Sequence, residues 1–334
     1  MDKTILAIES SCDETAISII KGHKEIVSNI VSSQIKNHMH NGGVVPELAS
    51  RLHLKNIDIV FNEALEEANM TIKDIDYIAV VNGPGLVGAL HVGIMFAKTL
   101  SYVNNIPLMP VHHIAGHIYA NNLVDELEFP LLALVVSGGH TELVLMKEHM
   151  SFEVLGQTLD DAIGECYDKV ARILGLGYPG GPIVDNLAKK GNHTYEFPIP
   201  LNDDSYNFSY SGLKSSVLNK VNQMKMKNEE INLEDFMYSF QYSAIKPLIQ
   251  KSIKAINEFD IKHFVLAGGV AANSYLRSEI EKAITDNNSE TKITLPPLWC
   301  CTDNGAMIAS LASYIDEKEF NKDYSFSVEV NKKL

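Results

Sequence analysis

Two histidines in the stretch VHHIAGH (111–117) have a spacing that suits metal binding. His113 and His117 are four residues apart, so in a helix both imidazoles would project from one face on adjacent turns. The zinc-protease signature has a glutamate directly after its first histidine as general base, but this chain has Ile114 there. The pair therefore suits a metal that holds and polarises a charged ligand rather than one that activates water. The spacing alone leaves open two helix-surface histidines without any ligand.

The elements that would position such a pair are repeated along the chain. Residues 5–20 have the pattern of a strand, a small polar turn and a second strand, and residues 131–146 repeat it with a Ser-Gly-Gly turn. A third strand-like run follows each pair, at 25–30 and 152–157. Apolar residues at helical spacing come next in both halves, around 47–69 and 160–174. This repetition predicts two α/β domains of the same construction.

A strand that runs into a glycine-rich turn and then a helix also occurs twice, at 77–100 and 263–284. Such turns let backbone amides at a helix start approach an anion closely. Either copy alone would be weak support, because glycine often serves strand-to-helix packing, but the repetition is more telling. Two domains with small polar turns facing one nucleotide cleft are the plan of the actin-like, sugar kinase and Hsp70 superfold.

The predicted fold is therefore α/β of this superfold, with two duplicated domains around a nucleotide cleft. We expect the first domain at 1–129 and the second at 130–302. A helix at about 303–318 should pack back on the first domain. Fold alone does not determine function.

Composition limits the classes of function. The net charge of −14, from 28 basic and 42 acidic residues, argues against a protein that grips nucleic acid alone through a broad basic face. No apolar run approaches the length of a membrane span, and the apolar stretch before Glu9 is too short for a secretory signal. The four cysteines show no paired spacing of the zinc-ribbon or redox kind. We expect a cytoplasmic protein with reduced thiols and no membrane partner.

Nine strings that follow one another along residues 4 to about 310 resemble a single family. They are ESSCDETAISI (9–19), GGVVPELASRLH (42–53), NGPGLVGAL (82–90), VHHIAGH (111–117), VSGGHTEL (136–143), YDKVARILGLGYPGGP (167–182), FSYSGLKSSV (208–217), AGGVAANSYLR (267–277) and CTDNGAMIA (301–309). The chain resembles the tRNA threonylcarbamoyladenosine transferases of the bacterial TsaD type, once regarded as sialoglycoprotein endopeptidases. The number and order of the strings make chance resemblance negligible.

The resemblance implies an activity and its partners. A threonylcarbamoyl group would pass from threonylcarbamoyl-AMP to N6 of the adenosine next to the anticodon, in tRNAs that read codons starting with adenine, with release of AMP. The implied partners are tRNA, a smaller paralogous subunit of the TsaB type and a P-loop ATPase subunit of the TsaE type. ATP or ADP are further candidate ligands of the same cleft. The helices around 47–69 and 86–104 are the candidates for the paralogue surface.

The resemblance also implies a divalent metal ion on His113, His117 and Asp303, with Fe²⁺ ranked before Zn²⁺. A carboxylate from a distant loop would complete a two-histidine, one-carboxylate face with open positions. The adjacent His112 leaves some ambiguity, and the spacing favours His113 with His117; His112 is then a neighbour of the ligands.

A second set of residues is implied to bind the nucleotide-bearing substrate. These are Val136, Ser137, Gly138, Gly139, His140, Asp168, Gly181, Asp185 and Asn273. Glycines at 138 and 139 would permit close backbone approach, and the polar residues would hold the ribose and adenine. Each polar residue is also typical of a helix cap or turn, and Asp185 and Asn273 taken alone fit caps better than ligands.

Three carboxylates, Glu9, Asp13 and Glu14, surround the first polar turn. Such residues are usually solvent-exposed, but Glu9 ends an apolar strand, where solvation is less favourable. If the turn projects into the cleft, Glu9 or Asp13 would orient the incoming amine or water, and Glu14 is the weaker candidate. Which of them acts as a base stays open.

Two other classes of protein share parts of this pattern. A sugar or acetate kinase would have the same fold but would depend on magnesium held by phosphates and carboxylates, and not on a histidine pair. An actin-like scaffold would retain or hydrolyse nucleotide without modifying tRNA. A metalloprotease is disfavoured because the glutamate after His113 is missing.

Overall fold

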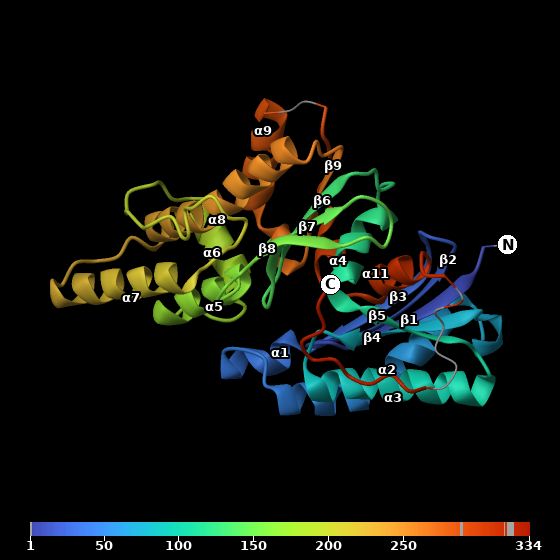
Figure 1. The fold of residues 1–334 in the computed structure, drawn as a ribbon. Helices are drawn as coiled ribbons and strands as arrows, with labels where there is room; N and C mark the ends of the chain where they lie inside the picture. The colour runs from blue at the N-terminus through green and yellow to red at the C-terminus, as the bar shows by residue number, and fades with distance from the viewer. Residues whose placement is uncertain (1, 288–289, 317, 319–323) are drawn as a thin grey trace. The chain divides into compact units, whose positions relative to one another are not determined.

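The computed structural model describes residues 2–287, 290–316, 318 and 324–334 (Figure 1). The chain divides into two compact units. Unit 1 consists of Met1–Leu127 and Leu298–Leu334, and unit 2 of Glu128–Pro297. The chain therefore leaves unit 1 for unit 2 once and later returns to it.

The described part of unit 1 is built on a five-stranded sheet in the order β3-β2-β1-β4-β5. Its strands are β1 (Thr4–Glu9), β2 (Glu14–Lys21), β3 (Glu25–Ser33), β4 (Tyr77–Gly83) and β5 (Leu108–His112). β1 pairs antiparallel with β2 and parallel with β4, and β4 pairs parallel with β5. Every residue of β1 and β4 is buried, as expected for apolar strands covered on both faces.

Helices cover this sheet on both faces (Figure 1). The described α-helices of unit 1 are α1 (Ile35–His38), α2 (Pro46–Ala68), α3 (Val87–Asn104), α4 (His113–Tyr119), α10 (Leu298–Cys301) and α11 (Gly305–Ala312). The long α2 begins with proline at its first position and is followed by Asn69 in the left-handed conformation, which are usual start and stop signals. α2 and α3 pack on one face, and α4 and α11 on the other.

Unit 2 repeats the topology of unit 1. Its sheet has the order β10-β9-β6-β7-β8, with antiparallel pairs β6–β7 and β7–β8 and parallel pairs β6–β9 and β9–β10. The strands are β6 (Leu131–Val136), β7 (Thr141–Met146), β8 (Glu153–Gln157), β9 (His263–Ala267) and β10 (Lys292–Thr294). The helices are α5 (Ile163–Ile173), α6 (Gly180–Ala188), α7 (Ser211–Met226), α8 (Leu233–Glu258) and α9 (Ser274–Asn287).

The α/β prediction is confirmed, including the two strands with a polar turn that open each half. The helix expected at about 303–318 is shorter in the structure: α11 covers Gly305–Ala312 and packs against β1 and β2. Residue 317 of that prediction lies outside the described residues. Among the described residues, none of the helices combines the length and the apolar character that a membrane span needs.

Candidate metal centre and nucleotide-binding turns

The histidine pair lies on α4, directly after the edge strand β5. His112 is the N-cap of this helix, and its Nδ1 accepts hydrogen bonds from the backbone N–H groups of Ile114 and Ala115. All seven residues of α4 are buried. The four-residue spacing puts the rings of His113 and His117 side by side, with centroids 4.7 Å apart.

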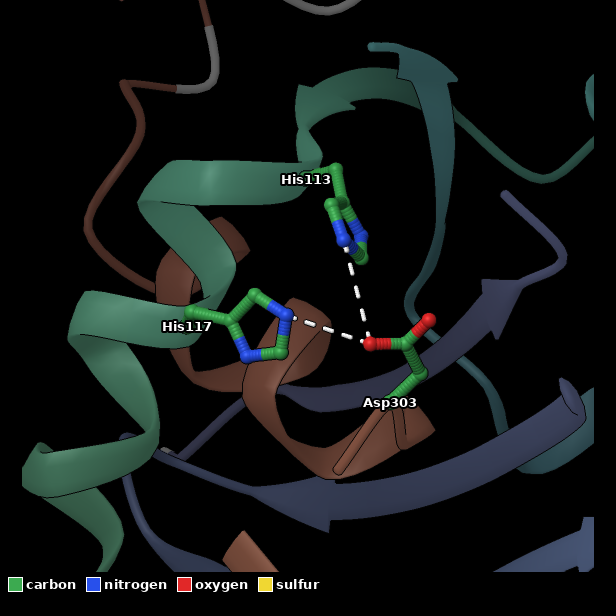
Figure 2. A group of neighbouring side chains, drawn as sticks. All are labelled: His113, His117 and Asp303. Carbon is green, nitrogen blue, oxygen red and sulfur yellow. Dashed lines mark ion pairs between the residues drawn. The ribbon is translucent and has the colours of Figure 1, made fainter. Parts of the chain in front are cut away.

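Asp303 faces both histidines from the loop between α10 and α11 (Figure 2). Its Oδ1 lies 3.1 Å from Nε2 of His117 and 3.8 Å from Nε2 of His113. One ligand atom from each of the three residues lies within 4.8 Å of the others. All three side chains therefore point toward one common position within unit 1.

The residues around this position fit a metal ion. His117 is 1% exposed, and among the described residues neither of its ring nitrogens has a hydrogen-bond partner. Its Nε2 faces Asp303 at ion-pair distance but without hydrogen-bond geometry. Buried polar atoms are rarely left unpaired, and a cation between the three side chains would give His117 a partner. Two imidazoles and one carboxylate are a donor set that suits iron or zinc.

Glu9 holds the ring of His113 from the opposite side. Its Oε2 lies 2.9 Å from Nδ1 of His113, and its Oε1 accepts a hydrogen bond from the backbone N–H of Ser11. Glu9 is fully buried at the end of β1. Burial alone would lower the pKa of His113, but the charges of Glu9 and Asp303 raise it to about 9. The carboxylates of Glu9 and Asp303 thus favour positive charge at the imidazole of His113.

The other carboxylates of the first turn lie close by. Asp13 and Glu14 are both buried, and burial together with the charges of Asp303 and Asp13 raises the pKa of Glu14 well above its usual range. The turn itself is held by His53 on α2, whose Nδ1 bonds Thr15 and whose Nε2 bonds the carbonyl of Cys12. Sequence patterns gave no sign of this role for His53, because the two segments are far apart in the chain.

The structure separates His112 from the three clustered residues. Its Nδ1 caps α4, and its Nε2 lies 3.2 Å from the carbonyl oxygen of Lys332. Both ring nitrogens are thus used in hydrogen bonds. The cluster with ligand atoms close together consists of His113, His117 and Asp303.

In unit 2 the predicted nucleotide-binding turn joins β6 to β7. It is a tight hairpin in which the N–H of Ser137 donates to the carbonyl of His140, and the N–H of His140 donates to Oγ of Ser137. Val136 is the last, buried residue of β6. A Cβ on Gly138 or Gly139 would meet no described protein atom within 4 Å. Packing therefore does not require glycine at these two positions, and their backbone is open to a ligand.

The end of the neighbouring strand β9 lies beside this turn. Because β6 and β9 are parallel, their carboxyl ends meet at the same sheet edge, where α/β proteins bind ligands. Gly268 follows β9 with a φ of +88°, and a Cβ there would overlap the carbonyl oxygen of Val136. Gly268 is thus required by the close approach of the two strand ends, in contrast to Gly138.

The remaining predicted ligands take part in helix-end contacts of unit 2. Asp168 on α5 accepts a hydrogen bond from the N–H of Gly180 at the start of α6, and burial raises the pKa of its carboxyl group. Gly181 on α6 would meet no described atom within 4 Å if it carried a Cβ. Asp168 therefore caps the start of α6, and the space beside Gly181 on that helix is open.

Asp185 and Asn273 connect α6, α8 and α9. Both carboxylate oxygens of Asp185 lie 2.9 Å from the hydroxyl of Ser274, the first residue of α9. Asn273 accepts from the N–H of Leu276 and donates to the amide oxygen of Gln241 on α8. Asp185 and Asn273 therefore both make contacts at the start of α9, as the alternative interpretation of them as helix caps predicted. Sequence reasoning missed both partners: Ser274 lies within the string 267–277 but was not singled out, and Gln241 lies on α8 outside the quoted strings.

The two sheets of identical topology and the histidine–aspartate cluster define an actin-like α/β protein with a candidate metal centre. Solved structures share this fold at low identity. Component A of (R)-2-hydroxyglutaryl-CoA dehydratase from Acidaminococcus fermentans is 17% identical and has a TM-score of 0.56, with 93% of this chain and 98% of that chain covered. HypF from T. kodakarensis is 13% identical and has a TM-score of 0.63, with 93% and 48% covered. These similarities show the fold alone.

The family is shown by sequence. The family model of TsaD, tRNA N6-adenosine threonylcarbamoyltransferase, matches residues 25–310. The tRNA N6-adenosine threonylcarbamoyltransferase of Bacillus subtilis (strain 168) is 56% identical over 327 residues, which are 98% of this chain and 94% of the relative. That of Staphylococcus carnosus (strain TM300) is 54% identical, with 96% and 94% covered. The chain belongs to this family of transferases.

Proposed function

We propose that the chain transfers a threonylcarbamoyl group from threonylcarbamoyl-AMP to N6 of the adenosine next to the tRNA anticodon, with release of AMP. The observation that carries the proposal is the convergence of His113, His117 and Asp303 in a member of this family. The acceptor amine is a poor nucleophile because its lone pair is delocalised into the ring. The donor is an activated mixed anhydride, so positioning and charge stabilisation are the main tasks of the enzyme.

His113, His117 and Asp303 would hold a divalent ion, and we rank Fe²⁺ before Zn²⁺. When bound, such an ion supplies positive charge that attracts a donor oxygen and stabilises the charge of the leaving phosphate. Glu9 touches the ring of His113, so its proposed role is to orient this histidine. Asp13 is buried in the turn between β1 and β2, and it is the proposed partner of the acceptor amine.

The adenylate part of the donor would bind in unit 2. The open backbone at Gly138, Gly139 and Gly181 supports this, because no described side chain or main chain fills the space beside these glycines. Asp168 and Asn273 hold the helix ends that surround this backbone and would contact the nucleotide with their remaining hydrogen-bonding capacity. ATP or ADP would occupy the same turns, since they share the adenylate.

A paralogous subunit would dock on the α2 and α3 surface of unit 1. A groove of about 410 Å³ between these helices is lined by Leu54, Ile57, His91, Val92, Met95, Phe96 and Thr99. Leu54 and Met95 remain 70% and 58% exposed, which is unusual for large apolar side chains side by side. Together with the acidic net charge, this surface supports a protein that presents tRNA with the help of a TsaB-type and a TsaE-type subunit.

The test is transfer of labelled threonylcarbamoyl from threonylcarbamoyl-AMP to unmodified tRNA, with wild type and Asp303→Ala, each with the two partner subunits. We expect label in tRNA with the wild type and none with the folded Asp303→Ala variant, because the variant lacks the carboxylate ligand. Full activity of a metal-replete Asp303→Ala variant would refute the metal-centred scheme. Failure of the folded, metal-loaded wild type with partners would refute the transfer itself.

A further inference from the structure

A segment near the carboxyl end, residues 324–334, runs along α3 to the ends of β4 and β5; we call it the strap. Tyr324, Phe326 and Val328 pack against the core of unit 1. Lys98 on α3 donates to the carbonyl oxygens of Tyr324 at 2.8 Å and Phe326 at 2.6 Å, with its ammonium group over the ring of Phe326. The first half of the strap is thus fixed by both apolar and polar contacts.

The end of β4 binds the second half of the strap. Asn82 is 1% exposed and uses its main chain and its side chain for this purpose. Its carbonyl accepts from the N–H of Glu329, its Nδ2 donates to Oε1 of Glu329, and its Oδ1 accepts from Nζ of Lys332, each at 2.8 Å. A Cβ on the next residue, Gly83, would overlap the carbonyl of Glu329. The end of β4 is therefore shaped for the strap.

The strap then reaches His112. The carbonyl oxygen of Lys332 lies 3.2 Å from Nε2 of His112, while Nδ1 of the same ring accepts from the N–H groups of Ile114 and Ala115. A neutral imidazole can accept at Nδ1 only when its proton is on Nε2. The Lys332 carbonyl accepts that proton, and the hydrogen-bond network thereby selects the tautomer that caps α4.

We propose that the strap positions the candidate metal centre through His112. The Lys332 carbonyl fixes the His112 ring, and the ring fixes the first turn of α4, on which His113 and His117 stand four residues apart. His112 is a positioning residue in this scheme, since both of its nitrogens are used in the link. The inference rests on the proposed metal site and adds the part of the chain that sets its geometry.

Four variants test the contact between the strap and His112 separately from the cap that His112 provides for α4. His112→Asn keeps a cap acceptor for α4 but is too short to reach the strap, because asparagine is a good N-cap with a compact side chain. A chain that ends at Val330 keeps the packed half of the strap and loses the Lys332 carbonyl. The third variant combines these two changes. Lys332→Ala is the matched control, since it removes the bond to Asn82 but retains the carbonyl that His112 uses.

The first readout is binding of Co²⁺, a spectroscopic probe. We measure the affinity of the protein for Co²⁺ and the visible absorption spectrum of the bound ion. Partners that orient a metal-ligating residue usually change affinity 10- to 100-fold, so we expect about tenfold weaker binding and an altered spectrum in His112→Asn and in the shortened chain. The combined variant should be no weaker than either single change, because both break one link. Lys332→Ala should bind like the wild type.

Unchanged Co²⁺ affinity and spectrum in the shortened chain would overturn the proposal, and so would losses that multiply in the combined variant. A second readout, hydrogen exchange of the α4 amides without metal, tests the strap independently of the metal site. If wild type and Asp303→Ala bind Co²⁺ equally, the proposed metal site is refuted. Hydrogen exchange of the α4 amides then tests by itself whether the strap positions α4. Faster exchange at 114–119 in the shortened chain then supports the positioning role, and unchanged exchange refutes it.

Discussion

At the scale of single residues, the candidate metal centre is organised by carboxylates on two sides of His113. Glu9 bonds Nδ1 and Asp303 faces Nε2, so the ring is aimed at the position between His113, His117 and Asp303. A carboxylate on the far nitrogen of a metal-binding histidine fixes its tautomer and raises its basicity. Glu9 is fully buried, and its other oxygen accepts a hydrogen bond from the backbone N–H of Ser11.

Glu9→Gln should therefore weaken metal binding without unfolding the protein. Glutamine keeps the shape and an acceptor for the N–H of Ser11 but removes the charge that His113 uses. We expect a loss of about 10- to 100-fold in affinity for Zn²⁺ or Co²⁺, measured by competition with a chelator. Glu47→Gln, an exposed change at the start of α2, is the control. Unchanged affinity in a folded Glu9→Gln protein would contradict the orienting role.

The sequence indicated the two candidate histidine ligands but not the side chains and backbone groups that contact them. The spacing of His113 and His117 predicts one helical face, because that relation is local. Asp303 required the family resemblance, since nothing in its own segment marks it as a ligand. The contacts of Glu9 and His112 were beyond reach, because they join segments that are distant along the chain and meet only in the folded unit.

At the scale of elements, two glycines at one sheet edge should respond in opposite ways to a methyl group. Gly138→Ala meets no described atom within 4 Å, so stability should be retained while binding of AMP weakens, because the ligand needs that backbone. Gly268→Ala has a φ of +88° and would overlap Val136, so it should lower the melting temperature. Calorimetric titration and thermal unfolding measure the two effects. Wild-type AMP affinity in Gly138→Ala would contradict the proposed nucleotide turn.

The start of α7 depends on a carboxylate from another segment. Asp160 accepts hydrogen bonds from the hydroxyls of Ser209 and Ser211 and from the N–H groups of Tyr210 and Ser211. Burial raises its pKa, but these bonds outweigh burial and lower the pKa from 3.8 to about 2. A lowered pKa means that ionised Asp160 stabilises the folded state at neutral pH, and this contribution fades as pH falls from about 4 toward about 2.

Asp160→Asn should consequently lower the melting temperature at neutral pH, by an amount that shrinks as the pH falls through about 4. The reason is that the wild-type carboxylate becomes protonated and loses the same charge that the variant lacks. Thermal unfolding over a pH series checks this, with Asp286→Asn on the exposed end of α9 as control. A difference between wild type and Asp160→Asn that stays constant with pH would show that the charge is unimportant.

Most elements could be predicted because their patterns are local. The strands of both halves are apolar runs bounded by polar turns, and α2 has an N-terminal proline and a left-handed asparagine at its ends. The helix expected at about 303–318 begins later because Asn304 caps α11 with its side chain, which leaves Asp303 in the loop. Capping depends on the turn conformation, which the apolar pattern does not report.

At the scale of the whole molecule, the exposed apolar groove on α2 and α3 predicts a partner. Met95→Glu should abolish the proposed heterodimer with a paralogous subunit, since a charge would be buried in an apolar interface. Size-exclusion chromatography of the mixed subunits measures this. Met226→Glu, at a side chain that is 84% exposed on α7 of unit 2, is the matched control and should assemble normally. An undisturbed heterodimer of Met95→Glu would exclude this surface.

The duplicated topology was evident from the repeated motifs, because each half carries the same order of strands, turns and helices. The sequence predicted that a helix at about 303–318 packs on the first domain, whereas Leu298–Leu334 belongs to unit 1 in the structure. Residues 324–330 of the strap alternate apolar and polar side chains, a pattern that suits a strand, but the structure forms no strand there. Lys98 and His112 contact carbonyl groups of the strap, which every sequence has. Backbone contacts of this kind become visible only in the folded chain.

Adding metal back to metal-free protein, and measuring transfer of labelled threonylcarbamoyl to tRNA with both proposed partner subunits present, shows whether transfer needs the ion at His113, His117 and Asp303. We expect label in tRNA to rise with added metal until each chain holds one ion, and Asp303→Ala to show no such rise. Full transfer by metal-free wild type, unaffected by a chelator, would contradict the role assigned to His113, His117 and Asp303.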